Sequence, residues 1–196
     1  DNSLRLNMAL FYTEYENLQL IIQRGISPLT ANAGESEITG FEAELVYFPV
    51  DELEVSANYG WTDAEYTKLD DRAKQVGINV DNKFNNTPEH SLNLAMDYRQ
   101  DLSSGGDVRW HLDVNWKDDT YNDAVNTESL KQDAMALVNA SVNFNSPDER
   151  WYIGLGIQNL TDKDYIVSGF NQPGVGFTYQ TLGRPREAYV NVGMHF

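Results

Sequence analysis

The feature that most constrains this chain is an alternation of apolar and polar side chains that recurs in segment after segment. Residues 107–117 are DVRWHLDVNWK, in which every second side chain is apolar: Val108, Trp110, Leu112, Val114 and Trp116. Successive side chains of a β-strand point to opposite faces, whereas helical spacing would mix the two sets. The sequence therefore predicts an all-β chain whose strands each have one apolar and one polar face.

The same pattern predicts eight antiparallel strands in the 196 residues. They lie at about 3–15 (with an extension to 23 left open), 36–48, 53–66, 90–100, 107–119, 134–145, 150–160 and 186–196. The connections alternate in length, the short ones near 49–52, 101–106 and 146–149 and the long ones near 67–89, 121–133 and 161–185. Short and long connections then fall at opposite ends of the sheet, which is typical of an outer-membrane barrel with tight periplasmic turns and long extracellular loops.

Composition narrows the class of protein further. No apolar run approaches the roughly 20 residues of a membrane helix, but strands of about 9–11 alternating residues also cross a bilayer and keep the mean hydropathy low, here −0.52. The net charge of −16 argues against nucleic acid as a partner, because phosphate binding requires clustered lysine and arginine. The chain begins without methionine or a signal peptide, and we interpret it as a mature fragment or an excerpt.

Two other architectures share part of this pattern. A stand-alone eight-stranded barrel, acting as a membrane anchor or adhesin, has the predicted number of strands, and its inward side chains would fill a narrow interior. A soluble, lectin-like β-sandwich would also have one apolar face per strand, but it has no reason to sort its short and long loops to opposite ends.

Four segments resemble TonB-dependent outer-membrane receptors. Residues 32–67, NAGESEITGFEAELVYFPVDELEVSANYGWTDAEYT, are similar to a hairpin of that family that turns at the periplasm and returns through a Tyr-Gly-x-x-Asp-Ala-x-Tyr stretch. NNTPEHSLNLAMDY resembles the strand entered after a long extracellular loop, GIQNLTDKDY the Asn-Leu-Thr-Asp segment, and GRPREAYVNVGMHF the closing strand. Their order and spacing follow the family along nearly the whole chain.

This resemblance implies a fold and a function. Residues 1–196 would be the C-terminal portion of an antiparallel transmembrane β-barrel, about the last eight of about 22 strands, with the plug domain, its TonB box and the earlier strands outside this sequence. The protein would reside in the outer membrane of a Gram-negative bacterium, in contact with lipid. Driven by the TonB complex through the plug, it would take up a scarce small molecule: a ferric siderophore in iron transport, vitamin B12, haem or an oligosaccharide.

Candidate ligand contacts come from the long loops, because loops carry recognition while the wall supplies rigidity. The stretches 68–89 and 165–182 are the candidates, and the second is rich in aromatic residues and glycine. The predicted ligand-binding residues there are Tyr165, Phe170, Phe177 and Tyr179.

The polar faces of the strands contain charges of both signs, which suggests that they pair with one another. The predicted lumen-lining residues, in contact with water or the plug, are Glu42, Glu44, Arg99, Arg109 and His111. The histidines at 90, 111 and 195 lie on separate strands without paired spacing, and no nucleophile–histidine–acid order or phosphate loop occurs. We therefore expect no metal site, no cofactor and no enzymatic activity.

The last predicted strand ends on an aromatic residue. Its outward side chains are Val190, Val192, Met194 and Phe196. A terminal aromatic on an alternating strand resembles the signal read by the outer-membrane assembly machinery. We interpret these four residues as that signal, although an ordinary edge strand would show the same alternation.

Overall fold

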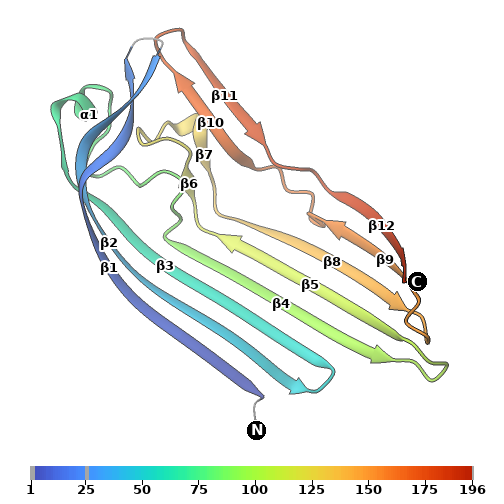
Figure 1. The fold of residues 1–196 in the computed structure, drawn as a ribbon. Coiled ribbons are helices and arrows are strands. Elements are labelled where there is room, and N and C mark those ends of the chain that lie inside the picture. The colour runs from blue at the N-terminus through green and yellow to red at the C-terminus, as the bar shows by residue number, and fades with distance from the viewer. Residues whose placement is uncertain (1–2, 25–26, 196) are drawn as a thin grey trace.

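The computed structural model describes residues 3–24 and 27–195, and it consists mainly of one large antiparallel sheet (Figure 1). Eight strands form the sheet in the order β1-β2-β3-β4-β5-β8-β9-β12. Their bounds are Leu4–Arg24, Ser27–Val50, Leu53–Leu69, His90–Asp101, Asp107–Lys117, Met135–Asn145, Trp151–Gln158 and Glu187–Met194. The predicted all-β fold and its eight wall strands are confirmed.

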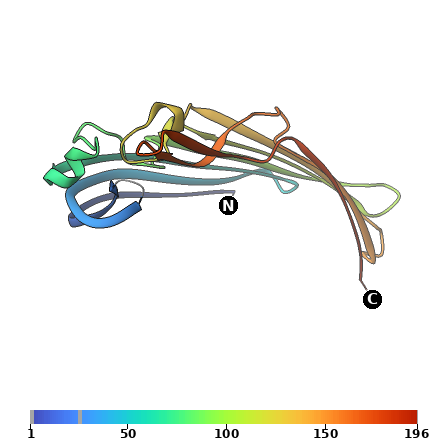
Figure 2. The same ribbon diagram turned by 90° about the horizontal axis from the view of Figure 1, so that it is seen from above.

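The sheet is open and bent (Figure 2). Among the described residues β1 pairs only with β2 and β12 only with β9, so these two strands are its edges. A stand-alone eight-stranded barrel would pair β1 with β12, and a sandwich would pack a second large sheet on the first. Neither arrangement occurs in the described parts of the chain, and the alternatives drawn from the sequence are wrong.

The strand register separates the two faces. One row of paired residues on the apolar face crosses all eight strands: Leu4, Tyr47, Val55, Met96, Leu112, Ala140, Ile157 and Ala188. A row on the polar face crosses β1 to β5: Asn7, Glu44, Asn58, Asn93 and Asn115. A shift of one residue in any pair would move a whole strand's apolar set to the other face, and the alternating sequence thereby specifies the register.

Three short turns lie at one end of the sheet and three long connections at the other, where β1 and β2 also meet (Figure 1). The strands β2 and β3, β4 and β5, and β8 and β9 are joined by short turns at the end where the described chain also starts and finishes. The long connections, 70–89, 118–134 and 159–186, gather at the opposite end, which we call the loop end. Within the described residues, no helix has the length and apolar character needed to cross a membrane.

The first hairpin is long. β1 continues to Arg24, in agreement with the extension to about residue 23 that the sequence left open, whereas β2 begins at Ser27 and not near residue 36 as predicted. The alternation is interrupted where the register shifts between Tyr15 and Leu18, and Asn17 has a φ of 57° there. Such a bulge changes which face each later side chain occupies, and alternation alone therefore does not define the extent of these strands.

The long connections contain structure of their own. It consists of α1 (Asp71–Gln75), β6 (Thr120–Tyr121), η1 (Glu128–Leu130), β7 (Lys131–Gln132), β10 (Ile166–Gln172) and β11 (Phe177–Leu182). Asp70 caps α1 by accepting a hydrogen bond from the backbone N–H of Ala73 at 2.9 Å, and this bond holds the pKa of the Asp70 carboxyl below its usual value.

A small hydrophobic core lies at the loop end. Its buried residues are Leu20, Ala33, Tyr66, Leu69, Ala73 and Ile78. They come from the extensions of β1, β2 and β3 and from the α1 segment, and Tyr66 also stacks on Phe84 at a centroid distance of 4.2 Å. This core fixes the first long connection against the strands that project beyond the rest of the sheet.

Candidate functional site

The first two long connections are joined by side-chain amides. Asn126 accepts a hydrogen bond from the Lys83 backbone N–H at 2.7 Å and donates one to the Lys83 carbonyl at 2.9 Å. Asn82 donates to the Ala124 carbonyl at 2.8 Å. The Lys83 ammonium lies 3.0 Å from Asp119, and this contact holds the pKa of the Asp119 carboxyl below its usual value. Residues 70–89 and 118–134 are therefore one hydrogen-bonded unit.

The third long connection is attached to the second. In its β10–β11 hairpin, the Asn171 side-chain amide donates a hydrogen bond to the Thr127 hydroxyl at 3.1 Å, and the Ile166 backbone N–H donates to the Gln132 side chain at 2.6 Å. Gly169 of β10 approaches Leu130 so closely that a Cβ there would collide with the leucine side chain. Glycine is required at this contact because the two segments could not otherwise approach each other.

A cavity of about 700 Å³ lies between these segments. Four parts of the chain line it: the ends of β1 and β2, the end of α1 with residue 85, residues 122–125, and residues 169–174. A volume of this size lies within the usual range for small-molecule sites, about 300–1,000 Å³. We refer to it as the loop cavity.

The lining of the loop cavity is apolar and amide-rich. Leu20, Ile21, Val125 and Phe170 supply apolar surface, while Gln19, Gln75, Asn85, Asn122 and Asn171 supply amides. Among the described residues no lysine or arginine lines it, and its one carboxylate, Asp123, accepts hydrogen bonds from the backbone and hydroxyl of Thr127 at 2.8 and 2.5 Å. The arrangement can hold a ligand by aromatic contact and by amide hydrogen bonds.

The four predicted ligand-binding residues occupy different environments. Phe170 lines the loop cavity. Tyr165 covers Gly183, where a Cβ would collide with the tyrosine ring. Phe177 and Tyr179 lie on β11 with exposed fractions of 49% and 59%, and neither is among the residues that line the cavity. Their roles stay predictions.

About half of the cavity lining falls in the two loop stretches predicted from the sequence, 68–89 and 165–182. The part that sequence reasoning missed comes from the first hairpin, at Gln19, Leu20, Ile21 and Pro28, and from residues 122–125 of the second long connection. The asparagines in the loops were a usable signal, because this residue type repeatedly holds irregular backbone together.

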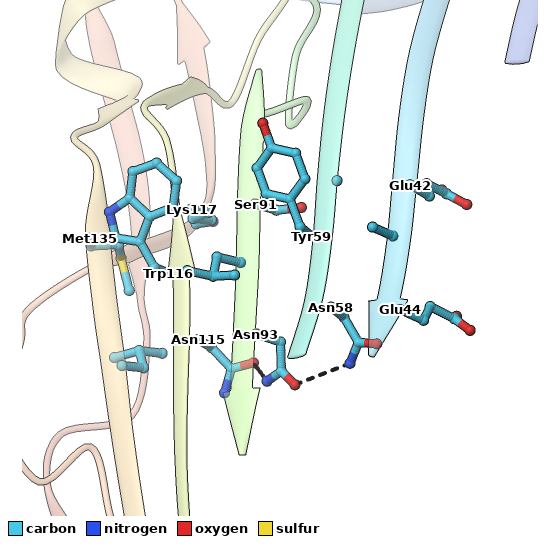
Figure 3. Close-up of a pocket in the computed structure, with 14 residues that line it drawn as sticks. Glu42, Glu44, Asn58, Tyr59, Ser91, Asn93, Asn115, Trp116, Lys117 and Met135 are labelled. Atoms are coloured by element: carbon cyan, nitrogen blue, oxygen red, sulfur yellow. Dashed lines mark hydrogen bonds between the residues drawn. The ribbon is translucent and has the colours of Figure 1, made fainter. Parts of the chain in front are cut away.

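A second hollow, of about 580 Å³, lies over the sheet (Figure 3). Glu42 and Glu44 of the predicted lumen-lining set border it, together with Asn58, Asn93 and Asn115. Asn58 donates to Asn93 at 3.4 Å and Asn93 donates to Asn115 at 2.7 Å, which forms the ladder of amides drawn in Figure 3. The polar face is therefore an ordered hydrogen-bonding surface that runs across several strands.

The remaining predicted lumen-lining residues lie nearer the short turns. Arg99 pairs with Asp101 at 3.0 Å and Arg109 with Asp107 at 2.9 Å. The two ring nitrogens of His111 face opposite ways, Nδ1 toward Asp97 at 2.8 Å and Nε2 toward Asp113 at 3.4 Å. Each of these three side chains therefore has an acidic partner within the polar face.

The closing strand presents its apolar side chains to the exterior. Val190, Val192 and Met194 of the predicted assembly signal have exposed fractions of 63%, 69% and 62%. The fourth, Phe196, lies outside the described residues. No protein element covers these side chains in the described chain, and the strand is an edge of the sheet.

An open, bent sheet with one apolar face, short turns at one end and structured loops at the other is a segment of a β-barrel wall. The sequence model described as "TonB dependent receptor-like, beta-barrel" matches residues 1–160. The chain belongs to the TonB-dependent receptor family. Members of this family are receptors and transporters rather than enzymes.

Similar proteins support the same assignment. A probable TonB-dependent siderophore receptor, PiuA, of Acinetobacter baumannii is 30% identical over 182 residues, which are 87% of this chain and 22% of that protein. Its crystal structure superposes with a TM-score of 0.73 at 26% identity, over 97% of this chain and 26% of that one. The ferric yersiniabactin uptake receptor FyuA of Yersinia pestis superposes with a TM-score of 0.83 at 22% identity, over 100% of this chain and 28% of that one. The present chain thus spans between 22% and 28% of the length of these proteins.

Proposed function

We propose that this chain forms the C-terminal wall segment and extracellular loops of an outer-membrane receptor that imports a ferric siderophore with energy from TonB. The observation that carries the proposal is the loop cavity, which lies between cross-linked loops above a wall of barrel type. The similarity to PiuA, which is described as a siderophore receptor, supports a siderophore over vitamin B12, haem or an oligosaccharide. The apolar face then meets lipid, and the polar face meets the lumen and the plug.

The chemistry of the loop cavity is consistent with such a ligand. A metal chelate has a broad organic surface that Phe170 can contact, and its peripheral carbonyl and hydroxyl groups can bond to the amides. The position of the loop cavity also supports ligand binding, because recognition sites usually lie on loops that are held by a rigid scaffold, here the sheet.

Binding is tested with the complete receptor that contains this chain, purified in detergent. ⁵⁵Fe-loaded hydroxamate, catecholate and carboxylate siderophores are titrated against the parent, Phe170→Ala and Phe48→Ala. We expect saturable binding of one class and a loss of about tenfold or more in Phe170→Ala, because an aromatic contact buried by ligand is removed. Phe48→Ala, at the short-turn end of β2 and away from the loops, should retain affinity. Absence of binding by every siderophore class would overturn the proposal.

Energisation is tested separately in cells. Uptake of the bound ⁵⁵Fe-siderophore should cease when the TonB complex is deleted, while binding to the cell surface persists. Uptake at the parental rate without TonB would contradict the energised mechanism.

We further propose that the closing strand is read during assembly of the barrel. Val190, Val192 and Met194 form an exposed apolar row that leads to the terminal Phe196. Deletion of Phe196 should lower the amount of receptor at the cell surface without altering affinity in the copies that assemble. Equal surface levels, measured by protease accessibility on whole cells, would remove this role.

A further inference from the structure

Three potential metal ligands meet at the base of two loops. Glu89 ends the first long connection, His90 begins β4, and Asp118 follows the end of β5. One ligand atom from each lies within 4.8 Å of the other two, and His90 Nε2 is 3.8 Å from Glu89 Oε1. Donors around a tetrahedral ion with bonds of about 2.1 Å are about 3.4 Å apart, so small side-chain rotations would close the group around an ion.

The strand register explains why these residues meet. Ser91 pairs with Lys117, so the next pair toward the loop end is His90 with Asp118, and the Asp118 backbone N–H donates to the His90 carbonyl at 2.9 Å. Glu89 is held from the other side, because its carbonyl accepts from the Thr62 backbone N–H at 2.9 Å. Backbone hydrogen bonds to β3 and β5 thus fix the positions of all three.

The imidazole of His90 is oriented by Tyr59. Tyr59 Oη lies 2.8 Å from His90 Nδ1, and the two rings are stacked with centroids 6.1 Å apart. A metal-bound histidine usually has its second ring nitrogen hydrogen-bonded, which fixes the ring and exposes the other nitrogen to the ion. Here Nδ1 is engaged by Tyr59, and Nε2 lies 3.8 Å from Glu89 Oε1.

The charge of this group is not balanced by protein cations. Neighbouring Asp119 lies near the ammonium groups of Lys83 and Lys131, at 3.0 and 3.9 Å. Within the described parts of the chain, neither Glu89 nor Asp118 has a lysine or arginine within ion-pair distance. The one basic side chain within that distance of Glu89 in this part of the chain is His90. Two adjacent carboxylates without a lysine or arginine partner favour a bound cation.

We propose that Glu89, His90 and Asp118 bind a divalent transition-metal ion of the Zn²⁺ class, with water as the remaining ligand. Imidazole nitrogen with carboxylate oxygens suits such ions better than Mg²⁺ or Ca²⁺, which take oxygen ligands. The ion ties the end of the first long connection to the ends of β4 and β5, and so stabilises the base of the loops. This site lies apart from the loop cavity and does not depend on which nutrient the receptor imports.

His111 supplies a matched control. It also has two carboxylates beside it, but they lie at opposite ring nitrogens and so do not converge on one point. A metal-stripped preparation of the complete receptor in detergent is titrated calorimetrically with ZnSO₄, for the parent, His90→Ala, Glu89→Gln, Tyr59→Phe and His111→Ala. Retention of the barrel fold is checked by migration of unboiled protein on a denaturing gel.

We expect His90→Ala to remove one Zn²⁺ equivalent relative to the parent and Glu89→Gln to weaken the site at least about tenfold, whereas His111→Ala leaves it intact. Tyr59→Phe should keep the stoichiometry and weaken affinity by about 10–100-fold, which is typical for loss of an orienting partner. Bound Co²⁺ should give a visible absorption band that disappears in His90→Ala. Equal Zn²⁺ stoichiometry and affinity in the parent and in Glu89→Gln would overturn the proposal. This comparison remains decisive if His90→Ala fails to fold.

Discussion

The wall and the loop end of this chain are organised by opposite rules. Fully or nearly buried apolar side chains occur at the loop end, for example Ile78 and Leu130, each with no exposed surface. In the wall, large apolar side chains such as Leu94, Leu112 and Val190 stay exposed on one face. The loop end therefore carries a core of the kind found in proteins that fold in water, whereas the wall has an apolar face without any protein cover.

The comparison shows where each part obtains its stability. Burial of apolar surface contributes about 25 cal/mol per Å², and at the loop end the protein itself supplies that burial. In the wall the same contribution requires lipid on the apolar face, while the strands satisfy their backbone groups through the ladder. Substitutions should then have different consequences in the two regions.

Ile78→Ala should destabilise the loop end by about 2–5 kcal/mol, because it leaves a cavity in the small core. The effect should be local, with faster hydrogen exchange in peptides from residues 70–89 and unchanged exchange in β4 and β5. Hydrogen exchange with mass spectrometry on the complete receptor measures both regions. Equal acceleration in the wall would contradict the separation of the two regions.

Leu112→Arg should lower the free energy of unfolding from lipid by about 2–4 kcal/mol if the residue lies near the bilayer midplane. Asn115→Arg, on the polar face of the same strand, should cost much less, because it meets the lumen. Denaturant titration in lipid vesicles provides the two values. Similar losses for both variants would show that the two faces are assigned wrongly.

Asn126→Asp should weaken the joint between the first two long connections by about 1–3 kcal/mol. The substitution keeps a residue type that tolerates the φ of 59° at this position, but it removes the amide donor to the Lys83 carbonyl. Exchange in residues 82–84 and 122–127 reports the change. Exchange as slow as in the parent would mean that this amide does not hold the loops together.

Lys83→Ala should have the smallest effect, at most about 1 kcal/mol, because its ion pair with Asp119 is partly exposed. The pair lowers the pKa of Asp119 in the folded protein, so its contribution is present above the unfolded value of about 3.9 and is lost as pH falls through the lower folded value. Carboxyl ¹³C NMR of Asp119 should show a titration midpoint that moves upward in Lys83→Ala. An unchanged titration midpoint of Asp119 in Lys83→Ala would mean that contacts other than Lys83 lower the Asp119 pKa.

The sequence predicts the wall better than the loop end, and the cause is physical. A strand with an apolar environment on one face and a polar environment on the other must alternate apolar and polar side chains. Trp110, Leu112 and Val114 therefore indicate both the strand and its apolar face. The pairing then follows from the short turns, and it places His90 opposite Asp118. The metal-ligand group could have been found from this register, although the spacing of histidines alone gave no sign of it.

The loop end could not be predicted in the same way. The hairpin β10–β11 and the contact between Lys83 and Asn126 depend on side-chain amides and on backbone bonds between distant segments, which leave no period in the sequence. The bulge at Asn17 interrupts the alternation of the first hairpin, and the start of β2 at Ser27 was not predicted. Of the four aromatic residues predicted to bind ligand, only Phe170 is among the described residues that line the cavity. Which aromatic residue reaches the cavity depends on how three loops pack together, and the sequence does not show this packing.

The most direct test of the account is the environment of each side chain along β5. The chain contains no cysteine, so single-cysteine variants, one for each position from 108 to 116, can each carry one spin label in this segment. In the complete receptor reconstituted in lipid, we expect even positions to be accessible to dissolved oxygen, as lipid-facing labels are, and odd positions to be accessible to a water-soluble reagent or shielded by the plug. This period of two would place the apolar face in lipid. Equal oxygen accessibility at even and odd positions, or access of the water-soluble reagent to positions 110, 112 and 114, would contradict the claim that this sheet is a membrane wall.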